Sequence, residues 1–353
     1  MNEYLNDKTL ESAGKCFVLI DRQTPVVQSR KGLLISIDLE KYDFNPDSGN
    51  LIRATEGTVL DRIPPRMQIR KDASLEIPHV QLLMDDPDDT VIGPLYRKAL
   101  SNEFELLYDI DLNEGGGHIK GYCIPGTSEC IEDIYAALSK LDSLINYNLM
   151  FAVGDGNHSL ATAKSHWDSI KSSVSDNHPA RFALVELINI YDSGINFEPI
   201  HRVLFNTSFD RFIKESKSLI PDLDVLISEK MSVNNAIVMA GTIDAGVLPV
   251  PVFYKDEAVV FTFPKSFGVL TVNVIQQIID KYIDKYPGTK VDYIHGESSV
   301  KSLAEKNIGI LLPAVSKDTF FGRIAGDGVF PRKTFSIGEA FEKRYYIECK
   351  KIK

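Results

Sequence analysis

The sequence has 353 residues, of which 44% are hydrophobic and 25% are charged, and its formal net charge is −10. This length and apolar content suit one large domain or two ordinary ones around a hydrophobic core. The acidic balance argues against a nucleic-acid-binding protein, because affinity for a phosphate backbone comes from clustered Lys and Arg. No apolar run in the sequence reaches the roughly 20 residues that a membrane-spanning helix needs.

Predicted strands and helices are interleaved along the chain without a regular βαβ rhythm. Short alternating or apolar runs predict strands, and apolar residues at helical spacing predict helices. In chain order we expect strands at Cys16–Ile20, Gly32–Ile37 and Phe104–Tyr108, a helix at Ile131–Leu144, a strand at Asn148–Val153, a helix at Leu160–Ser172, a strand at Phe182–Leu187, a helix at Ser208–Leu219, strands at Ala236–Met239 and Ala258–Phe263, helices at Val272–Tyr286 and Ser298–Glu305, and a strand at Ile308–Leu312. This order favours an α+β fold, a mixed sheet with helices, over a doubly wound parallel sheet.

Three regions are expected along the chain. Residues 1–204 form an N-terminal α+β region that holds the main polar motif. Residues 205–287 carry fewer clustered polar residues and are a candidate second lobe. Residues 288–353 are expected to return to the core as a C-terminal segment.

The cysteines and the N-terminus indicate a cytoplasmic protein. The four cysteines are Cys16, Cys123, Cys130 and Cys349, and none belongs to a Cys-x-x-Cys pair. So few cysteines in a long chain are typical of reduced thiols, which disfavours a bridge from Cys123 to Cys130 across a turn. The N-terminus has no hydrophobic signal region.

The main motif, Gly154-Asp155-Gly156-Asn157-His158-Ser159, stands between an apolar run and a helical pattern. We expect a strand, a tight turn and a helix, with the glycines permitting unusual dihedral angles and Asp155 or Asn157 capping the helix. The first turn of such a helix presents N–H groups and the positive end of its dipole, which favour phosphate or carboxylate. A purely structural turn needs one capping residue, and this one contains four candidate polar residues, so we favour an anion-binding turn.

The segment from Gly154 to Ala163 resembles the Asp-Gly-His-His-Arg signature of the family catalogued as domain of unknown function 1015 (DUF1015). Three other stretches resemble segments of that family in the same order: residues 52–62, with Thr55 in place of a His; the Pro-Ile-His-Arg of residues 199–202; and the Pro-Arg-Lys-Thr-Phe-Ser of residues 331–336. The resemblance therefore covers nearly the whole chain.

Two departures from the family pattern bear on activity. Asn157 and Ser159 replace the first His and the Arg of the signature, and the loss of the Arg removes a bidentate phosphate ligand. Family members also usually carry an N-terminal segment before the point where this chain begins. We therefore expect that a piece of the site is missing here.

The turn is also similar to the phosphate-binding turn of the ParB and sulfiredoxin folds, on which free serine kinases are built. This resemblance implies a ParB/sulfiredoxin-like phosphate-binding core plus a second lobe. It also implies ATP or ADP bound with Mg²⁺, and phosphoryl transfer to a small hydroxyl compound, with free L-serine as the leading candidate. The inference is fold-level analogy, and a fold does not fix a function.

These resemblances and the chemistry of phosphoryl transfer assign roles to individual residues. The predicted phosphate and nucleotide ligands are Gly154, Gly156, Asn157, Ser159, Arg53, Thr58, Arg62 and Lys333. The predicted catalytic residues are Glu56 as general base, Asp155, which also meets Mg²⁺ of the bound nucleotide, and His158. His201 and Arg202 are predicted to bind the substrate. For the satellite residues a structural alternative stays open: a polar helix start near Glu56, a surface His-Arg pair, and a solvated basic turn at Lys333.

Two other functions stay open beside the kinase. Loss of the signature Arg favours a regulatory protein that binds a nucleotide without transferring phosphate. A phosphoester hydrolase, in which His158 and Asp155 activate water, is the third possibility. In each case the expected partners are a nucleotide and a small-molecule substrate, with no nucleic acid and no membrane, and the sequence leaves the oligomeric state unknown.

Overall fold

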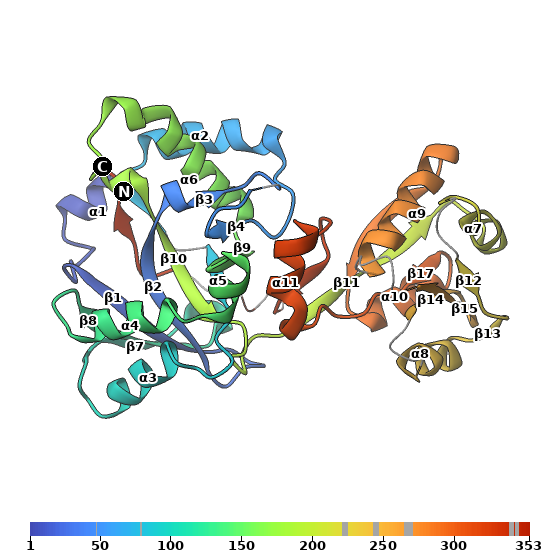
Figure 1. Cartoon of the computed structure of the whole chain (residues 1–353), viewed down its shortest axis with the longest axis horizontal. Helices are drawn as coiled ribbons and strands as arrows, with labels where there is room; N and C mark the ends of the chain where they lie inside the picture. Colours follow the sequence, from blue (N-terminus) through green and yellow to red (C-terminus); the bar gives the residue numbers. More distant parts are fainter. Residues whose placement is uncertain are drawn as a thin grey trace. The chain divides into compact units, whose positions relative to one another are not determined.

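A computed structural model describes residues 1–46, 48–77, 80–220, 225–242, 247–264, 271–338, 342 and 346–353. The chain divides into two compact units (Figure 1). Unit 1 contains Met1–Asn196, Lys317–Val329 and Ile337–Lys353, and unit 2 contains Phe197–Ser316 and Phe330–Ser336. The first segment of unit 2 thus runs from Phe197 to Ser316. The lobe expected from the sequence, at residues 205–287, falls within this segment.

Unit 1 is built on a mixed sheet whose described strands run in the order β3-β4-β9-β6-β10-β2-β1-β8-β7. Neighbours in this sheet are antiparallel except for the pairs β3–β4, β4–β9 and β6–β10, which are parallel. The strands are β1 (Cys16–Gln23), β2 (Arg30–Asp38), β3 (Tyr42–Asp43), β4 (Ile52–Arg53), β6 (Gln81–Met84), β7 (Glu105–Asp111), β8 (His118–Pro125), β9 (Phe151–Asp155) and β10 (Phe182–Asn189). A separate ladder pairs β5 (Leu75–Glu76) with β19 (Lys350–Lys351), which attaches the C-terminal segment to this unit.

Three helices of unit 1, α3, α4 and α6, pack on one face of the sheet. The helices of this unit are α1 (Asn2–Asn6), α2 (Ile63–Asp72), α3 (Ile92–Leu100), α4 (Cys130–Leu138), α5 (Asp142–Tyr147), α6 (Asn157–Ile170) and α11 (Lys317–Asp327). Apolar residues of α3, α4 and α6 share a core with strand residues such as Leu19 and Leu33. Because side chains alternate along a strand, the next residues, Ile20 and Leu34, belong to a smaller cluster on the other face.

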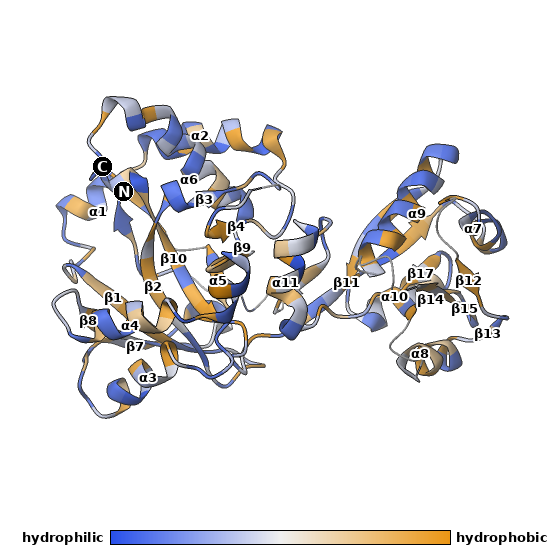
Figure 2. Cartoon of the chain, in the orientation of Figure 1, coloured by the Kyte–Doolittle hydropathy of each residue, from blue (hydrophilic) through white to orange (hydrophobic). Residues whose placement is uncertain are grey.

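Unit 2 holds a second sheet with the described order β12-β15-β14-β17-β11-β16, and β13 and β18 pair with β15 and β11. Its strands are β11 (Phe197–Phe205), β12 (Leu226–Ile227), β13 (Met231–Ser232), β14 (Val247–Tyr254), β15 (Glu257–Pro264), β16 (Lys290–His295), β17 (Ile308–Ile310) and β18 (Phe335–Ile337). Its helices are α7 (Phe209–Ser216), α8 (Val233–Thr242), α9 (Thr271–Lys285) and α10 (Glu297–Ala304). Helices α7 and α9 share one apolar cluster with the sheet, and α8 and α10 share another. In Figure 2 the hydrophobic residues are concentrated along strands such as β10 and β11.

The mixed α/β architecture confirms the predicted fold class, and two predicted elements are wrong. Residues Ala236–Met239 lie inside helix α8, because a four-residue apolar run does not distinguish a strand from a buried helix segment. The helix expected at Ile131–Leu144 is two helices, α4 and α5, separated at Ser139–Leu141. Within the part of the chain that is described, no helix is both long enough and apolar enough to cross a membrane.

Candidate functional site

The main motif forms the predicted strand, turn and helix. Strand β9 ends at Asp155, Gly156 adopts a left-handed conformation with φ of 90°, and helix α6 begins at Asn157. The Asp155 carboxylate accepts a hydrogen bond of 2.7 Å from the Gly156 N–H. Gly156 itself is the N-cap residue of α6, so the expectation that a side chain of Asp155 or Asn157 caps the helix is wrong. Asp155 instead fixes the turn, and the first amides of α6 follow directly after it.

The two positions of the turn favour glycine for different physical reasons. Gly156 supplies the positive φ, which a residue with a Cβ adopts only under strain. Gly154 lies in β9 under close packing: a Cβ there would come within 2.8 Å of Ile337 Cδ1 and 3.0 Å of Leu83 Cγ. Gly154 therefore admits neighbouring side chains, and Gly156 redirects the chain into the helix.

The segment Ala54–Val59 crosses the beginning of α6 and is hydrogen-bonded to it. The Thr55 N–H donates to Asn157 Oδ1 at 3.2 Å, and Asn157 Nδ2 donates to Thr55 Oγ1 at 3.4 Å. Thr55 Oγ1 donates in turn to the carbonyl of Val153 at 2.6 Å. At the other end of the segment, the Val59 N–H donates to His158 Nε2 at 3.2 Å. Glu56 and Thr58 lie between these anchors and are thereby held next to the turn.

This arrangement follows from the sheet. Strand β4 pairs in parallel with β9, with Ile52 opposite Phe151 and Arg53 opposite Ala152, so the residues after each strand leave the sheet at the same edge. Thr55 and Asn157, which the resemblance described above places where the family has histidines, meet there, although 102 residues separate them in the sequence.

The turn is neither fully buried nor fully exposed. Every residue of the range 154–159 is partly accessible to solvent, whereas the next helix residues, Leu160 and Ala161, are completely buried. Glu56 is also half-buried. The hydroxyl of Thr58 is buried and has no hydrogen-bond partner among the described residues. A buried hydroxyl without a partner costs about 1–3 kcal/mol, which a ligand that reached it would relieve.

The two predicted arginines of unit 1 differ in their surroundings. Arg53 donates through Nε to the carbonyl of Asn50 at 3.0 Å, and through Nη2 to the carbonyls of Tyr147 and Asn148 at 3.2 Å each. These contacts direct its guanidinium toward the C-terminal end of α5. Arg62 is exposed in a short 3-10 helix (Leu60–Arg62) that leads into α2, and α2 packs along α6.

His201, Arg202 and Lys333 lie in unit 2, and His201 and Arg202 are buried in strand β11. His201 Nδ1 accepts a hydrogen bond of 3.1 Å from the Leu312 N–H, and burial lowers the pKa of His201 to about 4. Arg202 donates to Gln276 Oε1 at 2.9 Å and to the carbonyls of Ile200 and Lys333 at 2.6 and 3.0 Å. Its substrate-binding role stays a prediction. Its bond to the Lys333 carbonyl joins residues 199–202 and 331–336, two of the stretches that resemble the family.

Lys333 has the left-handed conformation, with φ of 60°, and its side chain is exposed. The neighbouring Thr334 hydroxyl donates to the carbonyl of Pro331 at 2.6 Å, which closes the turn. A non-glycine residue at positive φ persists only where its surroundings hold it. The bond from Arg202 to the Lys333 carbonyl is one such constraint.

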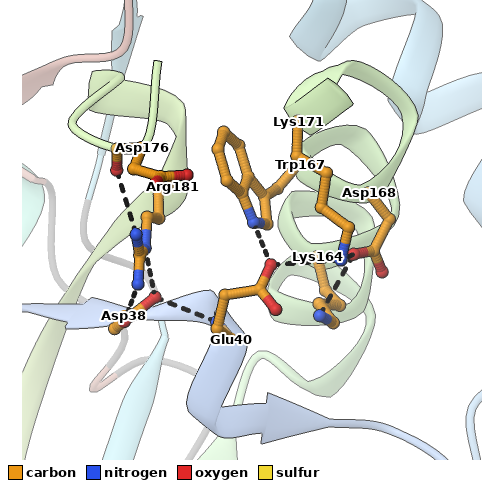
Figure 3. Close-up of polar contacts among 8 residues, drawn as sticks. All are labelled: Asp38, Glu40, Lys164, Trp167, Asp168, Lys171, Asp176 and Arg181. Carbon is orange, nitrogen blue, oxygen red and sulfur yellow. Dashed lines mark hydrogen bonds and ion pairs between the residues drawn. The ribbon is translucent and has the colours of Figure 1, made fainter. Parts of the chain in front are cut away.

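Polar contacts that no sequence pattern predicted fix the far end of α6 (Figure 3). The Trp167 indole N–H donates to the Glu40 carboxylate, which lowers the pKa of Glu40. Lys171 pairs with Glu40 at 3.2 Å and with Asp168 at 2.8 Å. The ring of Trp167 is buried in the core of unit 1, as its place on the apolar stripe predicted. The helix is thus anchored at both ends.

Among the described residues, no group of three or more His, Cys, Asp or Glu side chains is arranged to hold a metal ion. Asp155 is the carboxylate that belongs to the turn itself, and it is partly accessible. The described side chains around the turn therefore do not form a metal site by themselves.

The model of the family described as "Protein of unknown function (DUF1015)" matches residues 1–266. A conserved hypothetical protein from Pyrococcus furiosus is similar in structure, with 12% identity, a TM-score of 0.43, and coverage of 90% of this chain and 95% of that one. A free serine kinase in complex with AMP has 9% identity and a TM-score of 0.46, with 91% of each chain covered. SbnI with a C-terminal truncation, from Staphylococcus aureus, has 9% identity and a TM-score of 0.42, covering 89% of this chain and 85% of that one. No curated protein matches the sequence. Likenesses this weak do not transfer an activity.

Proposed function

This chain belongs to the family described as "Protein of unknown function (DUF1015)", and we propose that it is a phosphotransferase. It binds the phosphate groups of ATP or ADP at the turn Gly154–Ser159 and transfers a phosphoryl group to a small hydroxyl compound. Free L-serine is the first acceptor to test, on the resemblance of the turn to that of free serine kinases.

The observation that carries the proposal is the beginning of α6. The left-handed Gly156 places the first amides of a 14-residue helix at the end of β9, in a stretch that is partly open to solvent. The positive end of the helix dipole attracts an anion at such a position. Within the turn, the Gly156 N–H already donates to the Asp155 carboxylate and the Ser159 N–H to the Gly156 carbonyl. The effect is typically about 0.3–1 kcal/mol for a single exposed charge, so phosphate binding needs several amides acting together with side chains.

The segment Ala54–Val59 supplies the remaining groups of the proposed site. Its Thr58 hydroxyl, which has no partner within the described part of the chain, is suited to donate to a phosphate oxygen. Glu56, held between the Thr55 and Val59 anchors, would take the proton from the acceptor hydroxyl. Phosphoryl transfer needs mainly positioning and charge neutralisation, and one carboxylate near the acceptor fits that need.

Magnesium fits this site only as part of a metal–nucleotide complex. Asp155 is the residue of the turn that would meet the ion, and phosphate oxygens and water would complete its coordination. When bound, the ion would neutralise charge on the transferred group. In the protein itself, the Asp155 carboxylate accepts the Gly156 N–H and thereby holds the turn.

One observation favours a second function, a regulatory protein that binds a nucleotide without transferring phosphate. Ser159 stands where the family signature has an Arg. A Ser hydroxyl cannot replace the bidentate, charged contact that an Arg makes with a phosphoryl group. Binding would then persist while transfer is lost.

Incubation with ATP or ADP, Mg²⁺ and a panel of amino acids separates these functions. A phosphorylated amino acid supports the kinase, and saturable nucleotide binding without such a product supports the regulatory protein. Release of inorganic phosphate without an acceptor supports a hydrolase. Absence of nucleotide binding under all conditions would contradict all three.

The variant Glu56→Gln tests the base. It keeps the shape of the side chain and removes the proton acceptor, so we expect turnover to fall about 10²–10⁴-fold while the nucleotide dissociation constant is retained. Glu132→Gln, an exposed carboxylate on α4, is the matched control and should behave like the wild type. Normal turnover in Glu56→Gln would remove Glu56 from this role.

A further inference from the structure

Two of the four cysteines lie on one face of the unit 1 sheet, in neighbouring strands. Cys123 in β8 is directly opposite Val18 in β1, and Cys16 precedes Val18 by two residues in the same strand. Directly opposite residues of an antiparallel pair share a face, and so do residues two apart in one strand. Cys16 and Cys123 are therefore diagonal neighbours on the same side of the sheet.

The two thiols differ in access and interact with each other. Cys16 is half-buried at the first position of β1, while Cys123 is 7% exposed. Burial, and after it the neighbouring Cys123 thiol, raises the pKa of Cys16 to about 11. The Cys16 thiol is thus accessible to a small reagent, and the Cys123 thiol is buried next to it. The other cysteines are placed differently: Cys130 is buried with the Lys98 ammonium 3.1 Å from its sulfur, and Cys349 is exposed.

We propose that Cys16 and Cys123 form a redox-active thiol pair, which a small disulfide such as oxidised glutathione converts to an intramolecular disulfide. The Cys16 thiolate attacks one sulfur of the reagent, which breaks the reagent's S–S bond and releases one reduced thiol. The Cys123 thiolate then attacks the Cys16 sulfur of the mixed disulfide and releases the second thiol. The protein loses two protons and two electrons, which the reagent takes up as its disulfide becomes two thiols.

The geometry sets the conditions for this reaction. Diagonal neighbours have Cα atoms about 7–8 Å apart, slightly beyond the usual 4.4–6.8 Å of a disulfide. Because Cys16 is the first residue of its strand, the required shift involves a strand end rather than the middle of the sheet. A thiol is reactive as its thiolate, so oxidation should be slow at pH 7 and about tenfold faster for each pH unit up to pH 10.

The product would be a covalent link between β1 and β8, closing a loop that contains β2, β4, α2 and the Ala54–Val59 segment. Such a link restricts the unfolded chain far more than the folded one. Oxidation should therefore raise the thermal stability of unit 1, and added reductant should reverse the increase.

The test uses the full chain with Cys349→Ser, which removes the exposed thiol. After treatment with oxidised glutathione at pH 9, intact mass should show the loss of two hydrogens and no attached glutathione, and proteolytic mapping should link the peptides of Cys16 and Cys123. With Cys123→Ser added, glutathione should stay attached to Cys16. Cys130→Ser is the matched control and should oxidise as the parent does.

Three results would overturn the proposal. These are an unchanged mass at pH 9, stable glutathione on Cys16 while Cys123 is present, and loss of two hydrogens that persists after Cys123→Ser. If Cys123→Ser does not fold, peptide mapping of the parent chain still decides the question, because it shows directly whether Cys16 and Cys123 are linked.

Discussion

At the scale of single residues, both polar atoms of the Asn157 side chain contact Thr55. Its oxygen accepts from the Thr55 N–H and its nitrogen donates to the Thr55 hydroxyl. The role of Asn157 as a phosphate ligand stays a prediction, because a pattern within one turn shows the polar residues but not their partners. The contacts with Thr55 also suit a positioning residue that holds the Ala54–Val59 segment, and with it Glu56, against α6.

Asn157→Ala tests this positioning role. Loss of both contacts should destabilise unit 1 by about 1–2 kcal/mol. Turnover should fall, while the nucleotide dissociation constant stays within about threefold, which is under about 0.7 kcal/mol. The double variant with Glu56→Gln should be no less active than Glu56→Gln alone, because the two residues act as one unit. Asn146→Ala, exposed on α5, is the control. Loss of nucleotide binding in Asn157→Ala would show that the amide contacts the ligand after all.

At the scale of elements, the local turn was predictable and its partners were not. The strand, the two glycines and the helix of the main motif could be predicted because each depends on neighbouring residues. The pairing of β4 with β9, which brings Thr55 to Asn157, depends on the order of strands in a mixed sheet, and no local pattern specifies that order. The contact of Trp167 with Glu40 is equally non-local, since 127 residues separate them.

The far anchor of α6 should contribute to stability and not to the site. Trp167→Phe keeps an aromatic ring in the core but removes the indole N–H and part of the buried volume, so unit 1 should lose at least about 1–2 kcal/mol at pH 7, measured by circular dichroism during denaturation. Because the bond lowers the pKa of Glu40, its contribution is present above the unfolded pKa of about 4.3 and is lost as the pH falls below it. The difference between variant and wild type should therefore shrink toward pH 3. Weaker nucleotide binding in Trp167→Phe would show that the anchor also shapes the turn.

At the scale of the whole molecule, the family-like stretches are distributed over both units. The stretches at residues 52–62 and 154–163 meet in unit 1, and those at 199–202 and 331–336 meet in unit 2 through Arg202. The order of the stretches along the chain did not predict this grouping, because the chain leaves unit 2 after Ser316, runs through unit 1 at Lys317–Val329 and returns to unit 2 at Phe330. Each pair of stretches thus has a structural reason to occur together, whatever further role the residues have.

Unit 2 should respond to mild acid through His201, as unit 1 should to a smaller extent through the half-desolvated His166, whose pKa burial also lowers. The folded pKa of His201, about 4, lies below the ordinary 6.5, so the unfolded chain binds the proton first. Stability should therefore fall as the pH drops from about 6.5 to 4, by up to about 1.4 kcal/mol per pH unit, and level off below. Hydrogen exchange at the Leu312 amide, which donates to His201 Nδ1, should accelerate over the same range beyond its intrinsic pH dependence. His201→Gln retains an acceptor without a titrating ring and should flatten this response.

The control has the opposite sign: hydrogen bonds to Asp111 and Asp109 raise the pKa of His118 in unit 1, so its contribution to stability is lost as the pH rises. An acid response in unit 2 that survives His201→Gln would assign the effect to other groups.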